Sequence, residues 1–260
     1  MEIEEAQRRY REDGCFVAAD AVEPGMLDRL EAAARSVWTQ VRSGAVDVAG
    51  KGGDGGSIFG LLAPEFGEPA FAEYLCSDPV RRYVESFLGP ELRLGHVHLW
   101  CSDATYDTGW HRDHGAARDV SEAEEMEILN APKGSIKWQL ALVDDPCLWV
   151  VPASHLRYRT EQEHQALNVD RRMAIDGQQQ VVLKRGQTLF WNGSLVHRGV
   201  KPAGLDERLT LTGGLRQYDP AAGPEELDER FRWRLDANIR ATLPPRMQLW
   251  YDRWRMLQKG

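Results

Sequence analysis

The segment Gly109–Gly115, which runs Gly-Trp-His-Arg-Asp-His-Gly, decides how the rest of the chain is interpreted. His111 and Asp113 are two residues apart, so in an extended strand both side chains point to the same face. A distant histidine, His197, would complete a set of two imidazoles and one carboxylate. That set leaves three positions open on one side of Fe(II), as dioxygen chemistry requires. A single His-x-Asp triplet is nevertheless a weak signal, because most such triplets are surface or hydrogen-bonded residues.

Composition indicates one large globular domain. The 260 residues are 42% hydrophobic and 28% charged, and there is no apolar run of 18 residues. The net charge of −8 argues against binding to nucleic acid or to anionic lipid. The N-terminus, Met1–Glu5, is acidic and does not resemble a signal peptide. Four cysteines without C-x-x-C spacing favour a reducing cytoplasm over a disulfide or zinc framework.

The first part of the chain shows helical signals. We expect a short helix within residues 1–13, a strand at Cys15–Ala18 and a helix that begins at Pro24. A further helix begins at Asp78 and ends before Gly89. The glycine-rich segment 44–57 between them predicts a flexible loop.

From residue 92 the periodicity changes to two, which indicates strands. Leu92–Trp100 predicts one strand with His96, His98 and Trp100 on one face, where they either line a cavity or stay partly exposed. Further strands are predicted at 135–143, 147–151, 181–183, 188–191, 195–197 and 208–216, with a loop over 156–178 and helices over 225–258. The fold class is therefore mainly β with flanking helices, an antiparallel barrel or jelly roll.

The segment directly after the histidine motif is acidic. Ser121 and Glu124 fit a capping box, which predicts a helix through about Leu129. Such a helix is either a solvated face or part of a lid over the site. As a lid, segment 115–134 would move over the active site together with the loop 44–57.

Arg208 begins a strand on which Thr210 and Thr212 share its face, while Leu209 and Leu211 share the other. An arginine beside an iron site can hold a carboxylate through two parallel N–H bonds, and a 2-oxoacid offers such a group. The alternative is that Arg208 pairs with a neighbouring acidic residue, Asp206 or Glu207, at the surface.

Several motifs in order resemble the phytanoyl-CoA dioxygenase-like family of Fe(II)/2-oxoglutarate oxygenases, across most of residues 5–217. Leu148–His155 resembles the family's V-P-G-S-H element, with Ala153 where glycine is usual, and Asp144-Asp145-Pro146 replaces the usual E-N-G turn before it. The other matching segments are Tyr10–Val17, Trp110–Asp113, Gly186–Arg198 and Arg208.

The resemblance implies a double-stranded β-helix with His111, Asp113 and His197 as iron ligands. It also implies that Arg208 anchors 2-oxoglutarate, and it places Trp138 near this cosubstrate; Thr210, on the face of Arg208, is a further candidate. The expected cofactors are Fe(II), 2-oxoglutarate and O2, with release of succinate and CO2. The products would be hydroxylated, desaturated or ring-closed, since halogenating relatives lack the carboxylate that Asp113 supplies.

We expect one oxygenase domain over residues 1–260. It would comprise helical N-terminal support (1–90), a barrel core (91–217) and C-terminal helices (218–260). The expected partner is a small-molecule substrate, without nucleic acid or membrane, and the expected assembly is a monomer or homodimer.

Candidate substrate contacts are His96, His98, Trp100 and His114. The net charge and the acidic run of Glu122, Glu124, Glu125 and Glu127 favour a cationic, hydroxyl-rich metabolite, such as an amino sugar or an aminoglycoside-like compound of antibiotic biosynthesis. The alternative function is a metal-binding cupin-like isomerase or binding protein without oxygenase activity. A zinc hydrolase fits the mixed ligand set less well.

Overall fold

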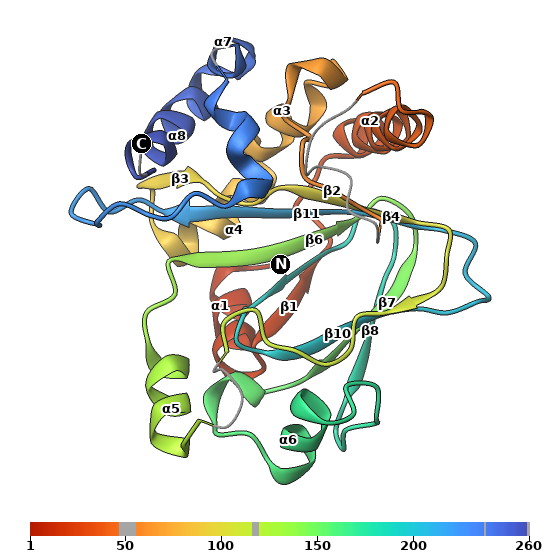
Figure 1. Ribbon diagram of the computed structural model, residues 1–260, viewed down its shortest axis with the longest axis vertical. Helices are drawn as coiled ribbons and strands as arrows, with labels where there is room; N and C mark the ends of the chain where they lie inside the picture. Colours follow the sequence, from red (N-terminus) through yellow and green to blue (C-terminus); the bar gives the residue numbers. More distant parts are fainter. Residues whose placement is uncertain (47–55, 116–119, 237, 259–260) are drawn as a thin grey trace.

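Two antiparallel sheets form the centre of the protein, and most helices cover the outer face of the larger one (Figure 1). The computed structural model describes residues 1–46, 56–115, 120–236 and 238–258. Most of the predicted glycine-rich loop, and residues 116–119 of the predicted lid segment, lie outside the described residues. Two facing antiparallel sheets with flanking helices confirm the predicted jelly-roll fold class.

The larger sheet has the order β1-β9-β6-β11-β4-β2, and β3 pairs with β11 beside β4. Its strands are β1 (Cys15–Ala18), β2 (Ser57–Ile58), β3 (Leu92–Leu94), β4 (His98–Ser102), β6 (Ser135–Ala141), β9 (Thr188–Trp191) and β11 (Arg208–Gln217). The smaller sheet has the order β5-β10-β7-β8, formed by β5 (Tyr106–Asp107), β7 (Asp145–Val151), β8 (Gln179–Leu183) and β10 (Val196–Lys201).

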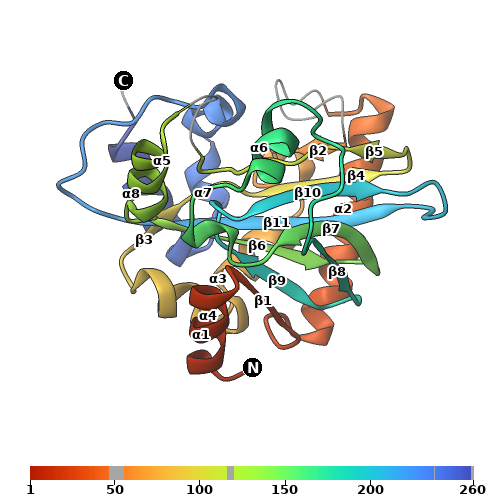
Figure 2. The ribbon, with the colours of Figure 1, turned by 90° about the horizontal axis from the view of Figure 1, so that it is seen from below.

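The helices form two groups. In Figure 1, α2, α3, α7 and α8 lie above the larger sheet, whereas α5 and α6 lie at the opposite end of the molecule. Figure 2 shows α1 beside α4, which it contacts. The helices are α1 (Ile3–Glu12), α2 (Pro24–Ser43), α3 (Ala70–Cys76), α4 (Asp78–Leu88), α5 (Glu122–Asn130), α6 (Glu161–Asn168), α7 (Ile239–Thr242) and α8 (Pro245–Met256), with short 3-10 turns at Pro64–Phe66, Ser154–Leu156 and Glu229–Leu235.

Side chains alternate along the central strands, and this alternation decides which residues face the interior. On β6 the apolar set Ile136, Trp138 and Leu140 packs with the helices in the main hydrophobic core. The intervening Lys137 and Gln139 line a cavity between the two sheets. The larger sheet therefore separates an apolar helical layer from a polar interior.

The strand predicted over Leu92–Trp100 is broken in the structure. It forms β3 and β4, with Gly95–Val97 between them. A Cβ on Gly95 would lie 2.4 Å from the carbonyl oxygen of Gly214, so only glycine fits where the chain passes β11 so closely.

The loop predicted over residues 156–178 contains the helix α6. Thr160 and Glu163 form a capping box, in which each side chain accepts a hydrogen bond from the other residue's backbone N–H. The T-x-x-E pattern was visible in the sequence and was missed. Helix α3 and the short strands β2 and β5 were also not predicted.

The N-terminal region supplies more than helical support, because β1 pairs with β9 at the edge of the larger sheet and β2 pairs with β4. Of the described helices, none combines the length and the apolar character that would let it cross a membrane.

Candidate metal centre

An antiparallel backbone bridge places His111 next to His197. Each of the two residues donates its backbone N–H to the carbonyl of the other, both at 3.0 Å. The backbone N–H of Asp113 donates to Gly193 at 2.7 Å, which ties the motif to the turn before β10. Hydrogen bonding between distant segments thus assembles the three residues.

Both imidazole rings are oriented by the same local contact. Nδ1 of His111 lies 2.8 Å from the carbonyl of Gly109, and Nδ1 of His197 lies 2.8 Å from the carbonyl of Leu195. A carbonyl only accepts, so each Nδ1 carries the proton and each Nε2 keeps a free lone pair. This is the tautomer that a histidine requires to bind a metal through Nε2.

The ligand atoms of His111, Asp113 and His197 all lie within 4.8 Å of one another. His197 Nε2 is 3.4 Å from Asp113 Oδ2. Burial lowers the pKa of His197 to about 4 against the opposing charge of Asp113. Desolvation raises the pKa of Asp113, but the charges of His197, Lys137 and His111 outweigh it and hold this pKa at about 2. Near neutral pH the site therefore offers a neutral His197 imidazole and an Asp113 carboxylate, the protonation states in which these groups bind metal.

Lys137 is a neighbour of this cluster that the sequence did not indicate. Its Nζ lies 2.6 Å from Asp113 Oδ2, and its side chain is 29% exposed. It reaches the carboxylate from the interior face of β6.

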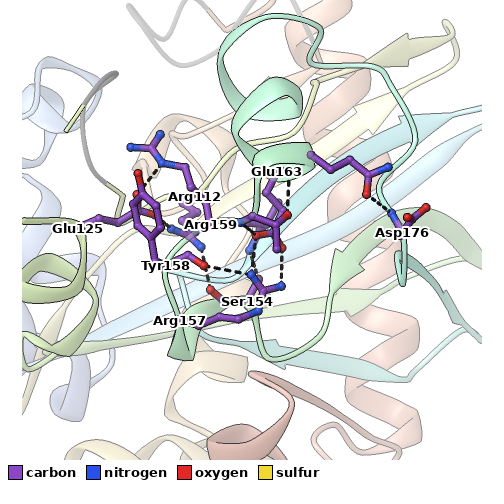
Figure 3. Close-up of polar contacts among 11 residues, drawn as sticks. Arg112, Glu125, Ser154, Arg157, Tyr158, Arg159, Glu163 and Asp176 are labelled. Atoms are coloured by element: carbon purple, nitrogen blue, oxygen red, sulfur yellow. Dashed lines mark hydrogen bonds and ion pairs between the residues drawn. The ribbon is translucent and has the colours of Figure 1, made fainter. Parts of the chain in front are cut away.

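Arg112, between the two ligands of the motif, is held in a buried ion cluster (Figure 3). It pairs with Glu125 of α5 and donates to the carbonyl of Ser154 at 2.8 Å. Glu125 also pairs with Arg159 at 2.6 Å, and its side chain is 1% exposed. The cluster joins α5 to the loop after β7 and fixes the backbone between His111 and Asp113.

Arg208 is buried at another part of the cavity, with 3% of its side chain exposed. Its Nη2 lies 3.1 Å from Asp145 Oδ2 and 3.1 Å from the amide oxygen of Gln139, and Nη1 donates to the hydroxyl of Tyr106. The alternative of surface pairing with Asp206 or Glu207 is wrong, because Arg208 is buried and its ion-pair partner is Asp145.

The surroundings of Arg208 fit a carboxylate cosubstrate. A Cβ on Gly199 would lie 3.4 Å from Arg208 Nη1, so glycine keeps space open beside the guanidinium. Thr210 and Thr212 share the interior face of β11 with Arg208, and both hydroxyls are buried without a hydrogen-bond partner. Unpartnered buried hydroxyls are costly unless a bound group pairs with them.

The structure does not place Trp138 near this site. Trp138 is fully buried, and it packs against Phe190 with ring centroids 6.2 Å apart. Gln139, the next residue, reaches Arg208 instead. The prediction was one residue out of register, because alternation along β6 turns Trp138 to the helical core.

A cavity of about 660 Å³ is lined by the candidate ligands His111, Asp113 and His197 and by Arg208. All four candidate substrate contacts line it, namely His96, His98, Trp100 and His114. Phe59 adds an aromatic surface and stacks on His98 with ring centroids 4.9 Å apart.

The acidic run does not line this cavity. Glu125 is buried in the cluster with Arg112, and Glu122, Glu124 and Glu127 are exposed on α5. The residues that supported a cationic substrate thus lie away from the cavity.

Asp145 and Gln139 are site residues that sequence reasoning missed. The alternation of β6 was a usable signal for Gln139, since apolar residues 136, 138 and 140 bracket polar ones. Asp145 was noticed only as a departure from the family's turn. Its pairing with Arg208 depends on contact between the two sheets.

Known proteins resemble this chain in sequence and in fold. The sequence profile of the family described as phytanoyl-CoA dioxygenase (PhyH) matches residues 10–203. A search of the curated proteins found no match.

Among solved structures, the chain is similar to SnoN, an epimerase from nogalamycin biosynthesis solved with Fe3+, alpha ketoglutarate and nogalamycin RO. The identity is 20% and the TM-score 0.59, over 87% of this chain and 93% of SnoN. It is also similar to EctD from S. alaskensis with 2-oxoglutarate and 5-hydroxyectoine, at 16% identity and a TM-score of 0.61, over 84% and 77% of the two chains. A third is HygX from Streptomyces hygroscopicus with nickel and 2-oxoglutarate bound, at 16% identity and a TM-score of 0.62, over 86% and 90%. At these identities the likeness shows the fold.

Proposed function

The chain belongs to the phytanoyl-CoA dioxygenase family of iron- and 2-oxoglutarate-dependent oxygenases, and we propose that it hydroxylates or oxidatively cyclises a small polar metabolite of a natural-product pathway. The observation that carries the proposal is one cavity that holds both the His111, Asp113 and His197 cluster and the buried Arg208. The natural-product setting rests on neighbours such as SnoN.

His111, Asp113 and His197 would hold the iron through two Nε2 atoms and one carboxylate oxygen. Arg208 would bind the far carboxylate of 2-oxoglutarate from its Nη1 edge, beside Tyr106 and the space that Gly199 leaves. When bound, iron and 2-oxoglutarate would react with O2 to supply an oxidant for unactivated C–H bonds, and 2-oxoglutarate would be converted to succinate and CO2.

The chain's own part is to position the substrate and exclude water. Asp145 and Gln139 orient the Arg208 guanidinium, so that its fork is preorganised before a carboxylate arrives. Phe59, His98 and Trp100 form an aromatic wall along which a ring-containing substrate can stack.

The amino-sugar hypothesis is not carried forward, because the acidic residues behind it do not line the cavity. A cupin-like binding protein would need the metal ligands but no arginine with unpartnered hydroxyls beside it. The Arg208 region therefore favours an oxygenase.

We also propose that the chain acts as one domain. Strand β1 from the N-terminal region pairs with β9 of the barrel, and the C-terminal helix α8 packs against β3.

The test measures metal binding and succinate release from 2-oxoglutarate by purified protein. His197→Ala should abolish both, because an iron with two protein ligands loses its geometry. The control is His164→Ala, which alters a histidine of α6 that does not line the cavity. Normal succinate release by His197→Ala would refute the ligand assignment.

A further inference from the structure

Two cations, Lys137 and Arg216, face the cavity from neighbouring strands. In the register of β6 and β11, Ser135 lies opposite Arg216 and Lys137 lies opposite Gly214, and all four residues line the cavity. Lys137 and Arg216 are therefore diagonal neighbours on the interior face, with Cα atoms roughly 7–8 Å apart. Gly214 has no side chain to separate them.

The cavity lining carries more positive than negative charge. Its cations are Lys137, Arg171, Arg208, Arg216 and Arg230, whereas Asp113 is the one carboxylate among the described lining residues. Arg208 and Arg230 each have a carboxylate of their own outside this lining, Asp145 and Asp228.

Lys137 and Arg216 lack such a dedicated partner. The carboxylate of Glu225 is 3.8 Å from Arg216 and already pairs with Arg93. Lys137 pairs with Asp113, whose carboxylate the proposed iron site requires. With a divalent cation beside Asp113, Lys137 gains a like-charged neighbour, and a bound anion would balance it.

The cavity histidines respond to this positive charge. Burial, followed by the charge of Arg216, lowers the pKa of His96 to about 3. Burial, followed by the charge of Lys137, lowers the pKa of His98 to about 3. Both rings are therefore neutral near pH 7, and the positive charge of the cavity lining comes from its lysine and arginines.

This cation pair is separate from the cosubstrate arginine. Arg208 and Arg216 lie eight positions apart on β11, a separation of roughly 26 Å between Cα atoms. A five-carbon diacid held by Arg208 is too short to reach Arg216, so an anion at Arg216 must belong to another molecule.

We propose that Lys137 and Arg216 form an oxyanion subsite that binds a carboxylate or phosphate group of the substrate. This proposal rests on the proposed function, because it names the substrate class of the same cavity. Ser135 adds a hydroxyl donor, and the aromatic wall of Phe59, His98 and Trp100 contacts the carbon skeleton.

The test uses the full chain loaded with Mn(II) and 2-oxoglutarate, without oxygen. Paramagnetic relaxation of ³¹P in inorganic phosphate and of ¹³C in acetate reports whether each anion binds near the metal. We expect saturable relaxation by at least one of them and none for the methyl protons of tetramethylammonium. Saturation by phosphate alone identifies a phosphate ester as substrate, and saturation by acetate alone identifies a carboxylate.

Arg216→Gln should weaken anion binding by about tenfold or more, while Arg216→Lys keeps most of it. Lys137→Gln is a second, independent variant with the same expectation. The matched control is Arg232→Gln, since Arg232 pairs with Glu229 and does not line the cavity. Wild-type affinity in both Gln variants, or saturable binding of tetramethylammonium in place of the anions, would overturn the subsite.

Equilibrium dialysis of radiolabelled phosphate needs no metal and separates the two proposals. Phosphate binding that depends on Arg216, in a protein that binds no Mn(II), would refute the oxygenase site and retain the subsite. Mn(II) binding without any binding of phosphate or acetate would refute the subsite alone.

Discussion

The two ends of strand β11 carry the same residue type in opposite electrostatic situations. Arg208 is 3% exposed, and Asp145, Gln139 and Tyr106 surround its guanidinium. Arg216 is 35% exposed, and its nearest carboxylate is shared with Arg93. Buried partners fix Arg208, whereas the positive charge of Arg216 is only partly balanced.

The difference shows how one strand can serve two tasks. A buried arginine must be paired, because an uncompensated charge away from water is strongly unfavourable. That pairing also preorganises it for a ligand of fixed shape. A half-exposed arginine tolerates incomplete pairing because water solvates it, so it stays available to bind anions of different shapes.

The largest expected effect is on the free energy of unfolding, which should fall far more when Arg208 is replaced than when Arg216 is replaced. Arg208→Met leaves Asp145 buried without its cation and should lower the free energy of unfolding by about 3–5 kcal/mol. Arg216→Met should change it by about 0.5 kcal/mol or less, as for other partly exposed positions. Urea unfolding of the two variants measures both values, and equal losses would mean that the two ends do not differ.

A smaller effect concerns cosubstrate binding. Arg208→Lys keeps a positive charge but loses the planar fork, so the KM for 2-oxoglutarate should rise about 30-fold or more. Arg216→Lys should leave this KM unchanged, because Arg216 lies at the far end of the strand. The measurement is succinate formation at varied 2-oxoglutarate concentration. A strong rise in the Arg216 variant would exchange the roles of the two arginines.

The smallest effect tests the space beside Arg208. Gly199→Ala adds a Cβ 3.4 Å from Arg208 Nη1, which should raise the KM for 2-oxoglutarate by roughly threefold, about 0.6 kcal/mol. Gly223→Ala is the control, since a Cβ there meets nothing within 4 Å. A KM in Gly199→Ala equal to that of the control would place the cosubstrate elsewhere.

Local patterns predicted much of the fold. The helices that begin at Pro24 and Asp78, the strand Cys15–Ala18 and the alternation along β11 all follow from turn residues and short-range periodicity. The grouping of the candidate metal ligands was also predictable, because the spacing of His111 and Asp113 is local and the resemblance supplied His197. Errors arose where the resemblance was not checked against strand alternation, as at Trp138, or where a capping box was overlooked, as at Thr160.

Sequence patterns were enough to single out the candidate residues: two histidines and a carboxylate proposed for iron, an arginine proposed for a carboxylate, and alternating strands that present them. Which charges meet depends on tertiary contacts. Asp145 reaches Arg208 across the two sheets, Lys137 reaches Asp113 from β6, and the acidic run turns away from the cavity. Electrostatic interactions depend on distance and burial rather than on order in the chain, so the excess positive charge beside the site cannot be read from a net charge of −8.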